Sequence, residues 1–333
     1  MDPRTTYMVT YEDILEARDN LHPDIIRTPL QIWRFGSQVT DRVVQAKLEN
    51  LQRTGSFKAR GAWNKLRLMR PPHRDAGVIC ASAGNHAQGV ALAAHLMETH
   101  ATIVMPTNTP RIKVKQTRLY GTPEIILHGG SLREATEHAY TIQKERGMYF
   151  VHPFDDEAVI AGQGTVGLEI IEQWPELDTI VVPVGGGGLI AGIATAILSH
   201  HPDIRVIGVQ AKDSDAAARS MEKGRIISLR GSRTMADGIN VGTIGESPFK
   251  ILRKYNVPIL RVTEEEIQAT ITDLCQTSKL VVEPAGAASA ALVLFHTDEL
   301  VTSRRIVCLL SGANINTSDF ADILKAHPDV TPD

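Results

Sequence analysis

One lysine has the surroundings of a nucleophile or a base. Lys58 lies in the segment Thr54–Gly61, which reads Thr-Gly-Ser-Phe-Lys-Ala-Arg-Gly and predicts a helix whose first turn contains the lysine. The positive end of a helix disfavours an ammonium group, and so do neighbouring cations such as Arg53 and Arg60. We therefore expect a lowered pKa for Lys58 if its site is buried, which is what Schiff-base chemistry requires. Considered by itself, a lysine is more often a solvated surface residue.

Four successive glycines, Gly185–Gly188, follow an apolar run and precede an apolar stretch that begins at Leu189. A glycine turn between a strand and a helix can direct several backbone N–H groups at one anion, and the helix dipole adds to the attraction. A loose turn would need a single glycine, and four of them carry an entropic cost. The segment therefore predicts a phosphate site.

The residues after the glycines help to indicate which kind of phosphate-containing ligand this turn would bind. Gly186, Gly188 and Ala191 match the dinucleotide pattern G-x-G-x-x-A, which also needs an acidic residue at the end of the next strand. That strand leads into Gln210, and no G-x-x-x-x-G-K-[ST] pattern is present. These departures disfavour a nucleotide, and with it a nicotinamide-dependent dehydrogenase.

A second polar turn, residues 81–86, reads Ala-Ser-Ala-Gly-Asn-His and separates an apolar run from an apolar helix. Its small residues would let backbone N–H groups and side chains bind a carboxylate. A helix cap formed by Ser82 or Asn85 would explain the same residues. Cys80 occupies the first glycine position of a G-x-S-x-G elbow around Ser82, so serine-hydrolase chemistry is not supported.

The elements that must position these turns alternate between short apolar runs and amphipathic stretches. The runs that predict strands are Val43–Leu48, Val78–Ala81, Ala101–Met105, Glu124–Leu127, Thr179–Val184, Ile204–Val209 and Arg305–Leu310. This alternation is typical of an α/β fold with parallel sheets. Ser311 directly follows the last run, and strand ends of this kind are the usual place for ligand contacts, although a turn serine needs no such role.

Residues 76–153 form three compact strand–helix units, and the strands after them are joined by longer helices. We therefore predict a small domain, residues 76–153, inserted into a larger domain made of residues 1–75 and 154–333. Ligands usually bind in the cleft between such domains.

Helix starts can also be read from the sequence. Thr10 with Asp13 and Thr263 with Glu266 have the spacing of capping boxes, and Thr109 before Pro110 predicts a cap followed by a first-turn proline. We expect Pro328–Asp333 to be a frayed tail.

The composition fits a soluble enzyme. The 333 residues include 35 Lys+Arg and 38 Asp+Glu, a formal charge of −3, and 5% aromatic residues, so neither a cationic excess nor stacking platforms point to nucleic acid. No secretory signal and no apolar run of membrane-spanning length is visible. Cys80, Cys275 and Cys308 are too few and too scattered for a disulfide framework. We expect a cytoplasmic enzyme that binds neither nucleic acid nor membrane.

Taken together and in this order, the segments resemble the fold-type II pyridoxal-phosphate enzymes, specifically the threonine/serine dehydratase and serine racemase family. The matching motifs are Ser-Phe-Lys-x-Arg-Gly-Ala at 56–62, Ser-x-Gly-Asn-His-x-Gln-Gly at 82–89, Ala-Gly-Gln-Gly-Thr at 161–165, the four glycines at 185–188, Val-Glu-Pro-x-Gly-Ala at 282–287 and Ser-Gly-x-Asn at 311–314. The resemblance covers essentially the whole chain. It implies a tryptophan synthase β-like fold with two parallel-sheet α/β domains, and a catabolic type without a regulatory domain.

The resemblance implies pyridoxal 5'-phosphate as cofactor and assigns roles to the segments. Lys58 would form the Schiff base and then act as the base at the substrate α-carbon, with Ser82 as a second catalytic candidate. The cofactor would be bound by Lys58, Phe57, Asn85, Gly185, Gly186, Gly187, Gly188, Leu189, Gly238 and Ser311, with the glycine turn on its phosphate and Ser311 at its pyridine nitrogen. The substrate carboxylate would meet Ser82, Ala83, Asn85 and His86.

The same resemblance implies a lyase acting on a small hydroxy amino acid. L-Threonine or L-serine would lose water and yield 2-oxobutanoate or pyruvate with ammonia. Related racemases have a serine where this chain has Ala83, and an alanine has no proton to exchange, so we expect a dehydratase. The Pro153-Phe154-Asp155 segment also resembles the dehydratase branch.

Several alternatives stay open from the sequence. A 3-hydroxyaspartate ammonia-lyase would need a cation for the second carboxylate, for which Arg133 is a candidate. A serine racemase and a non-catalytic sensor of a phosphate ligand are the others. Relatives that bind a divalent cation use two carboxylates where this chain has Gln210 and Ala216, so we expect no metal site. A homodimer or homotetramer is implied by the resemblance alone.

Overall fold

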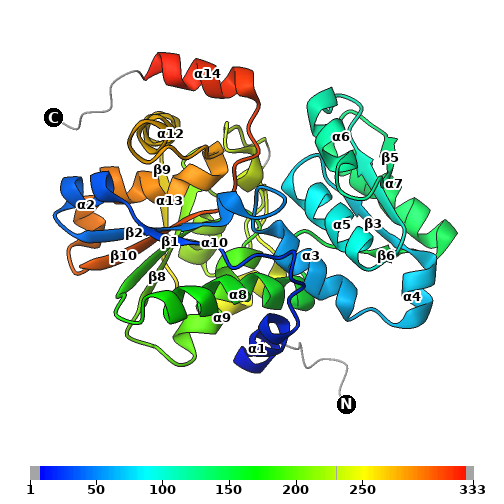
Figure 1. Ribbon diagram of the computed structural model, residues 1–333, viewed down its shortest axis with the longest axis horizontal. Helices are drawn as coiled ribbons and strands as arrows, with labels where there is room; N and C mark the ends of the chain where they lie inside the picture. The colour runs from blue at the N-terminus through cyan, green and yellow to red at the C-terminus, as the bar shows by residue number, and fades with distance from the viewer. Residues whose placement is uncertain (1–7, 230, 328–333) are drawn as a thin grey trace.

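Two β-sheets organise the molecule, and each forms its own lobe (Figure 1). The structure is a computed structural model that describes residues 8–229 and 231–327. The predicted tail, Pro328–Asp333, lies outside the described residues. Within those residues no helix has the length and hydrophobicity needed to cross a bilayer.

The larger sheet has six strands in the order β1-β2-β10-β7-β8-β9. Its strands are β1 (Leu30–Ile32), β2 (Val43–Leu48), β7 (Thr179–Pro183), β8 (Arg205–Ala211), β9 (Ile259–Val262) and β10 (Arg305–Leu310). Neighbouring strands are parallel except for β1, which is antiparallel to β2. Helices cover both faces, which explains the continuous apolar sequences of β7 and β10.

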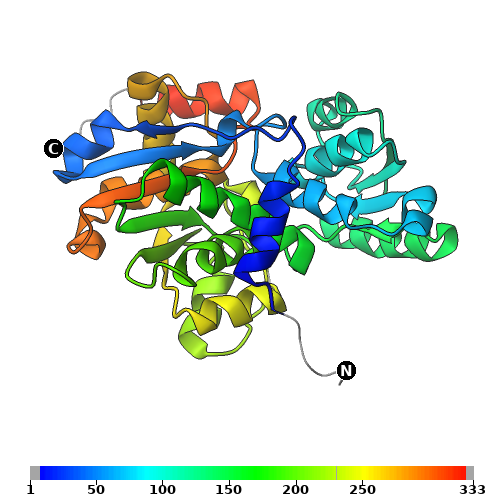
Figure 2. The same cartoon turned by 60° about the horizontal axis from the view of Figure 1, so that its bottom comes forward.

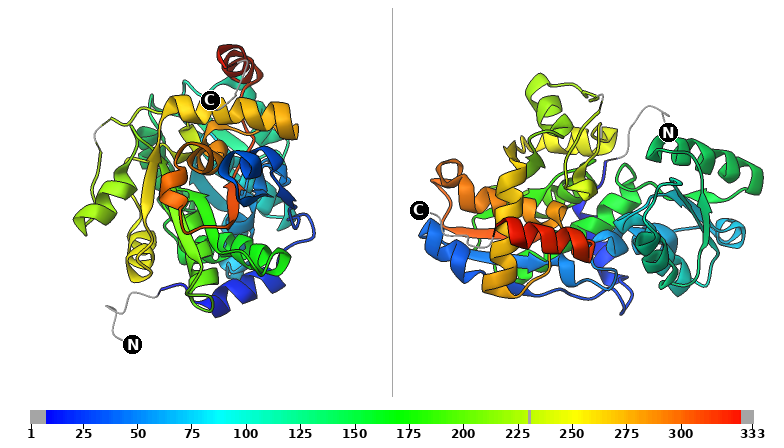
Figure 3. Two further views of the ribbon diagram at one scale, coloured as in Figure 1. Left: turned by 90° about the vertical axis from the view of Figure 1, so that its left-hand side faces the viewer. Right: turned by 90° about the horizontal axis from the view of Figure 1, so that it is seen from above.

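Each face of the larger sheet has its own set of helices. One face packs against α2 (Arg34–Thr40), α12 (Glu264–Ser278) and α13 (Pro284–Phe295). The other packs against α8 (Glu157–Gln173) and α9 (Gly188–Leu198), with α10 (Ala216–Lys223) and α11 (Glu246–Lys254) beyond them. Figure 2 shows α1 (Tyr11–Asp19), which lies against α8 and α9. Figure 3 shows α14 (Thr317–Ala326), which lies against α12.

The smaller sheet has four parallel strands in the order β5-β4-β3-β6. They are β3 (Val78–Ala81), β4 (Ala101–Met105), β5 (Glu124–Leu127) and β6 (Tyr149–Phe150). In β3 the side chains alternate: Val78 and Cys80 pack with α3 (Lys58–Arg67) and α5 (Asn85–Leu96), whereas Ile79 and Ala81 pack with α7 (Leu132–Arg146). The helices α4 (Pro71–Ala76) and α6 (Arg111–Arg118) complete the lobe.

The α/β class with parallel sheets is confirmed, and most strands begin and end where the sequence predicts. The sequence did not reveal β1, β6 or β9. All four strands of the smaller sheet come from one continuous segment between β2 and β7, which supports the proposed inserted domain of residues 76–153. The side chains of α3 nevertheless contribute to the core of the smaller sheet.

The predicted helix starts are mostly confirmed. Both capping boxes, Thr10 with Asp13 and Thr263 with Glu266, are formed. The predicted cap at Thr109 is wrong: Pro110 is itself the N-cap residue of α6, no side chain caps this helix, and the Thr109 Oγ1 is buried without a hydrogen-bond partner. A third capping box, at Ser131, was not predicted.

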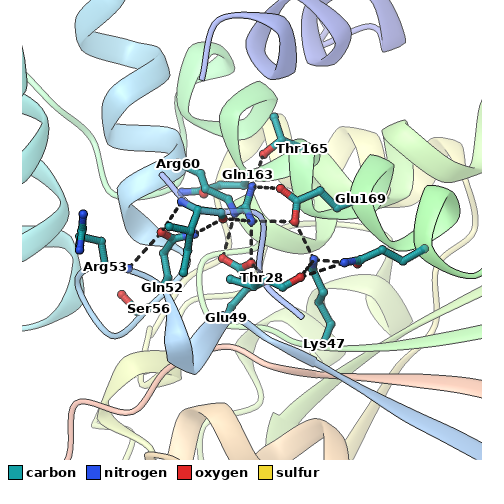
Figure 4. Close-up of polar contacts among 12 residues, drawn as sticks. Thr28, Lys47, Glu49, Gln52, Arg53, Ser56, Arg60, Gln163, Thr165 and Glu169 are labelled. Atoms are coloured by element: carbon teal, nitrogen blue, oxygen red, sulfur yellow. Dashed lines mark hydrogen bonds and ion pairs between the residues drawn. The ribbon is translucent and has the colours of Figure 1, made fainter. Parts of the chain in front are cut away.

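A buried ion cluster joins α3 to the larger sheet (Figure 4). The Arg60 guanidinium donates to both Glu49 oxygens at 2.8 and 2.9 Å and to both Glu169 oxygens at 2.6 and 2.9 Å. The Lys47 ammonium donates to Glu169 at 2.6 Å. Lys47 belongs to β2, Glu49 to the 3₁₀ turn that follows it, and Glu169 to α8. Two cations therefore balance two carboxylates inside the protein, and each group is paired.

Arg60→Met tests what this cluster contributes. The variant leaves Glu49 and Glu169 buried without their main partner, so we expect the free energy of unfolding to fall by about 3–5 kcal/mol. Urea unfolding followed by circular dichroism measures the change. Arg133→Met is the matched control, because Arg133 is exposed and pairs with Glu137 at the surface. A midpoint for Arg60→Met equal to that of the control would contradict this account.

Candidate active site

A cavity of about 400 Å³ opens between the two sheets. It lies where β3, β7 and β10 end, as expected for the carboxyl ends of parallel strands. All the residues predicted to bind cofactor or substrate line it: Phe57, Lys58, Ser82, Ala83, Asn85, His86, Gly185, Gly186, Gly187, Gly188, Leu189, Gly238 and Ser311. The structure thus brings together segments that are far apart in the sequence, and their individual roles remain proposals.

Lys58 is the first residue of α3, as predicted. Its Nζ donates a hydrogen bond to the Pro153 carbonyl at 2.8 Å. The surrounding protein desolvates the amine and lowers the pKa of Lys58 to about 8, while the charge of Glu283 partly offsets this effect. The predicted fall of the pKa on burial is confirmed, but the neighbouring arginines do not cause it. Arg60 is held in the buried ion cluster, and Arg53 is exposed and pairs with Asp24.

The glycine turn forms the opposite wall. β7 ends at Pro183 and α9 begins at Gly188, and no side chain caps the first turn of α9. Gly187 has a positive φ of 92°, which favours glycine. A Cβ on Gly188 would lie 2.6 Å from the Phe154 carbonyl oxygen. The glycines therefore let Phe154 pack directly against the turn, a Cβ on Gly186 being 2.3 Å from its ring, while Gly185–Gly188 line the cavity.

This wall fits a phosphate group. An uncapped helix N-terminus leaves first-turn N–H groups free to donate to an anion, and the helix dipole favours negative charge there. Ser311, at the end of β10, is 3% exposed and lines the same cavity. The residues present thus suit a phosphorylated ligand that reaches from the glycine turn to Ser311 and Lys58.

A chain of amides and a carboxyl group connects the two lobes through Asn85, the first residue of α5. Its Nδ2 donates to Glu283 at 2.7 Å, and its Oδ1 accepts from Asn314 at 2.6 Å. Asn314 also donates to the Thr54 carbonyl at 2.8 Å. Burial and the nearby carboxylate of Asp237 raise the pKa of Glu283 to about 8. Glu283 is therefore mostly protonated at neutral pH, and its buried side chain adds little negative charge to the cavity.

His86 has a neutral ring in this cavity. Burial, and then the charge of Lys58, lower the pKa of His86 to about 3, although its Nε2 makes a 2.9 Å hydrogen bond to the Val151 carbonyl. The ring therefore cannot act as a cation for a substrate carboxylate, which leaves its backbone N–H for that purpose. The neighbouring Ser82 hydroxyl accepts from the Gly84 N–H at 3.2 Å and faces the cavity.

Among the other residues that line the cavity are Lys113, Asp237, Glu283 and Asn314, for which no role was predicted. Glu283 and Asn314 lie inside motifs that resemble the family, so those motifs were the available signal. Nothing near Lys113 distinguishes it from an ordinary surface lysine. The predicted candidate Arg133 is wrong as a cavity cation: its side chain is 87% exposed, and it does not line the cavity.

The side chains in the region where we expect no metal site bind other groups of the protein. The Gln210 Nε2 donates to the Val184 carbonyl at 3.1 Å, and its Oε1 accepts from the Ala218 N–H at 2.9 Å. The nearby carboxylate of Asp215 pairs with Arg219 and Arg261. Among the described residues, no group of three or more His, Cys, Asp or Glu side chains could hold a metal ion.

Comparisons with known proteins place these residues in context. A family model described as "Pyridoxal-phosphate dependent enzyme" matches residues 21–312. The chain is 46% identical to an L-threonine ammonia-lyase of Thermotoga maritima, over 93% of this chain and 77% of that protein. It is 42% identical to the catabolic L-threonine dehydratase TdcB of Staphylococcus aureus, over 97% and 94%. The solved structure of maize serine racemase superposes with a TM-score of 0.91 at 33% identity, over 97% of this chain and 98% of that chain.

The pKa of Lys58 can be tested through the rate at which cofactor-free protein captures pyridoxal 5'-phosphate. The neutral amine is the nucleophile, so the rate should rise with pH and level off above about 8, whereas an ordinary lysine levels off near 10.5. Stopped-flow absorbance measures capture, with Nα-acetyl-lysine as the control amine. Glu283 is about half ionised near pH 8, where its charge raises the pKa of Lys58, so Glu283→Gln should lower the midpoint modestly. A wild-type midpoint near 10.5 would refute this explanation.

Proposed function

The chain belongs to the pyridoxal-phosphate-dependent enzyme family, and on that premise we propose that it is an L-threonine/L-serine ammonia-lyase. It eliminates water from L-threonine or L-serine, and the released enamine then reacts with water to give 2-oxobutanoate or pyruvate and ammonia. One observation carries the proposal: the same cavity contains an amine of lowered pKa, an uncapped glycine turn and a neutral serine hydroxyl. The two relatives at 42–46% identity support the choice of reaction.

When bound, pyridoxal 5'-phosphate supplies an aldehyde for the amine and a ring that withdraws electrons from the substrate α-carbon. The glycine turn from Gly185 to Gly188, with Leu189, holds its phosphate. Asn85 would hold its ring hydroxyl, Phe57 and Gly238 would line its ring site, and the Ser311 hydroxyl would be available to its ring nitrogen.

Lys58 Nζ takes the α-proton of the substrate. The pKa of about 8 leaves part of the amine neutral at physiological pH, so the group is able both to accept a proton and to give it up. The carbonyl of Pro153 orients the amine. The backbone N–H groups of the turn at 82–86, with the Ser82 hydroxyl, bind the substrate carboxylate and fix the α-carbon beside Lys58.

Ser311 and Ala83 together favour elimination. A serine hydroxyl cannot give the ring nitrogen a full proton as a carboxylic acid would, so negative charge at the α-carbon is poorly stabilised and the β-hydroxyl leaves promptly. Ala83 offers no acid or base on the face opposite Lys58. The α-carbon therefore cannot be reprotonated efficiently from that side, which argues against a racemase.

We further propose a cytoplasmic location and a homodimeric or homotetrameric state. Cys80, Cys275 and Cys308 are free thiols, which suits a reducing compartment. The oligomeric state rests on the resemblance to the family.

The reaction is tested by incubating the holoenzyme with L-threonine, L-serine and 3-hydroxyaspartate and measuring 2-oxo acid and ammonia. We expect the two products in equal amounts from L-threonine or L-serine, and a loss of about 10²–10⁴-fold or more in kcat for Lys58→Ala. Lys115→Ala is the control, because Lys115 is an exposed lysine outside the cavity. A protein that binds the cofactor without turnover, or a Lys58→Ala variant that keeps activity, would exclude the proposed reaction.

The preference for elimination over racemisation is tested at Ala83. With L-serine, wild-type protein should form D-serine about 10²–10⁴-fold more slowly than pyruvate, and Ala83→Ser should increase D-serine formation because it restores a hydroxyl on that face. Chiral chromatography measures D-serine. Ala83→Gly changes the size of the side chain without adding a hydroxyl and should not increase it. Wild-type D-serine formation that rivals pyruvate formation would show the assignment to be wrong.

A further inference from the structure

An ion pair crosses the cavity between the two lobes. Lys113 comes from α6 of the smaller lobe, and Asp237 comes from a 3₁₀ turn, Asp237–Ile239, of the larger lobe. The Lys113 Nζ lies 2.6 Å from the Asp237 Oδ2, and both residues line the cavity. Their side chains are 21% and 57% exposed, which places the pair towards the mouth.

The pair lies close to the inner part of the site. Asp237 directly precedes Gly238, and a Cβ on Gly238 would be 3.5 Å from a Glu283 carboxyl oxygen and 3.8 Å from the Asn85 amide nitrogen. The charges of Asp237 and Lys113 both act on Glu283, in opposite directions. A substrate that reaches Asn85 therefore has its side chain within the field of this pair.

The other titratable groups that line the cavity either have a proposed role or carry little charge. Lys58 is the Schiff-base residue, the His86 ring is neutral, and Glu283 is mostly protonated at neutral pH. Among the described residues that line the cavity, Lys113 is therefore the cation left to meet an acidic substrate side chain, and Asp237 already neutralises it.

We propose that the Lys113–Asp237 pair determines substrate specificity by excluding substrates that carry a second carboxylate. Asp237 repels such a carboxylate and occupies the ammonium group that would otherwise bind it. The neutral side chains of threonine and serine experience neither effect. The inference deepens the proposed function and rests on it, because it explains why a 3-hydroxy amino acid with an uncharged side chain is preferred to 3-hydroxyaspartate.

Asp237→Asn tests the proposal, because it keeps the shape of the side chain while it removes the charge. We expect the ratio of kcat/KM for 3-hydroxyaspartate to that for L-threonine to rise about two- to fivefold, the effect of one partly exposed charge pair. Lys113→Met alone should not raise this ratio. Combining Lys113→Met with Asp237→Asn should abolish the rise that Asp237→Asn produces alone. Lys115→Met and Asp213→Asn, which change exposed charges outside the cavity, are the controls.

A binding measurement separates this inference from the proposed reaction. L-Malate and L-lactate differ by one carboxylate and have no amino group, so their binding to the holoenzyme, followed by the visible spectrum, needs no turnover. Asp237→Asn should tighten the binding of L-malate about two- to fivefold and change that of L-lactate little. If wild-type protein fails to turn over threonine and serine, the proposed function fails while the malate comparison still tests the pair.

Two results would overturn the specificity role. One is a wild-type preference for 3-hydroxyaspartate over threonine. The other is that Asp237→Asn and Lys113→Met affect both substrates and both ligands equally. That result would be expected if the ion pair only held the two lobes together. Thermal unfolding of each variant checks that its fold is intact.

Discussion

The Arg60 guanidinium, fully buried between Glu49 and Glu169, is the contact on which the arrangement of the site depends. Glu49 follows β2 and Glu169 lies in α8, so the first turn of α3 is fixed to the larger lobe while Ala62 and Leu66 pack into the core of the smaller one. Lys58 begins that turn. Its amine therefore meets groups from both lobes, and a charge cluster of this kind is tolerated inside a protein only because each member has partners.

Desolvation then decides which protonation states the cavity contains. The same physical effect lowers the pKa of Lys58 and of His86 and raises that of Glu283, because in each case burial disfavours the charged form. At neutral pH the His86 ring and most of Glu283 are therefore uncharged and part of Lys58 is neutral, with the paired charges of Lys113 and Asp237 at the mouth. An amine that must act first as a nucleophile and then as a base benefits from this environment, since it has to exist in both states.

Local signals in the sequence predicted the strands that end at the site and the residues that follow them, because apolar runs and glycine turns are properties of short segments. Pairing partners are not such properties: β1 and β6 are two to three residues long and exist because β2 and β3 lie beside them. The sequence also contains no sign that Arg60 pairs with Glu169, 109 residues away. Its charge was therefore expected to act on Lys58. Lys113 meets Asp237 across 124 residues, and no spacing rule connects them.

The two lobes that line the cavity contribute different functional groups to the site. The larger lobe contributes the glycine turn and Ser311, whose geometry suits a phosphate and a ring nitrogen. The smaller lobe contributes the turn at 82–86, which we propose binds the substrate carboxylate, and Lys113. A hydroxyl at position 83 of the smaller lobe, or the loss of the Asp237 charge that pairs with Lys113, would change the groups that meet the substrate and leave the glycine turn as it is. A fold with such a site can carry more than one reaction, because the chemistry depends on a few side chains.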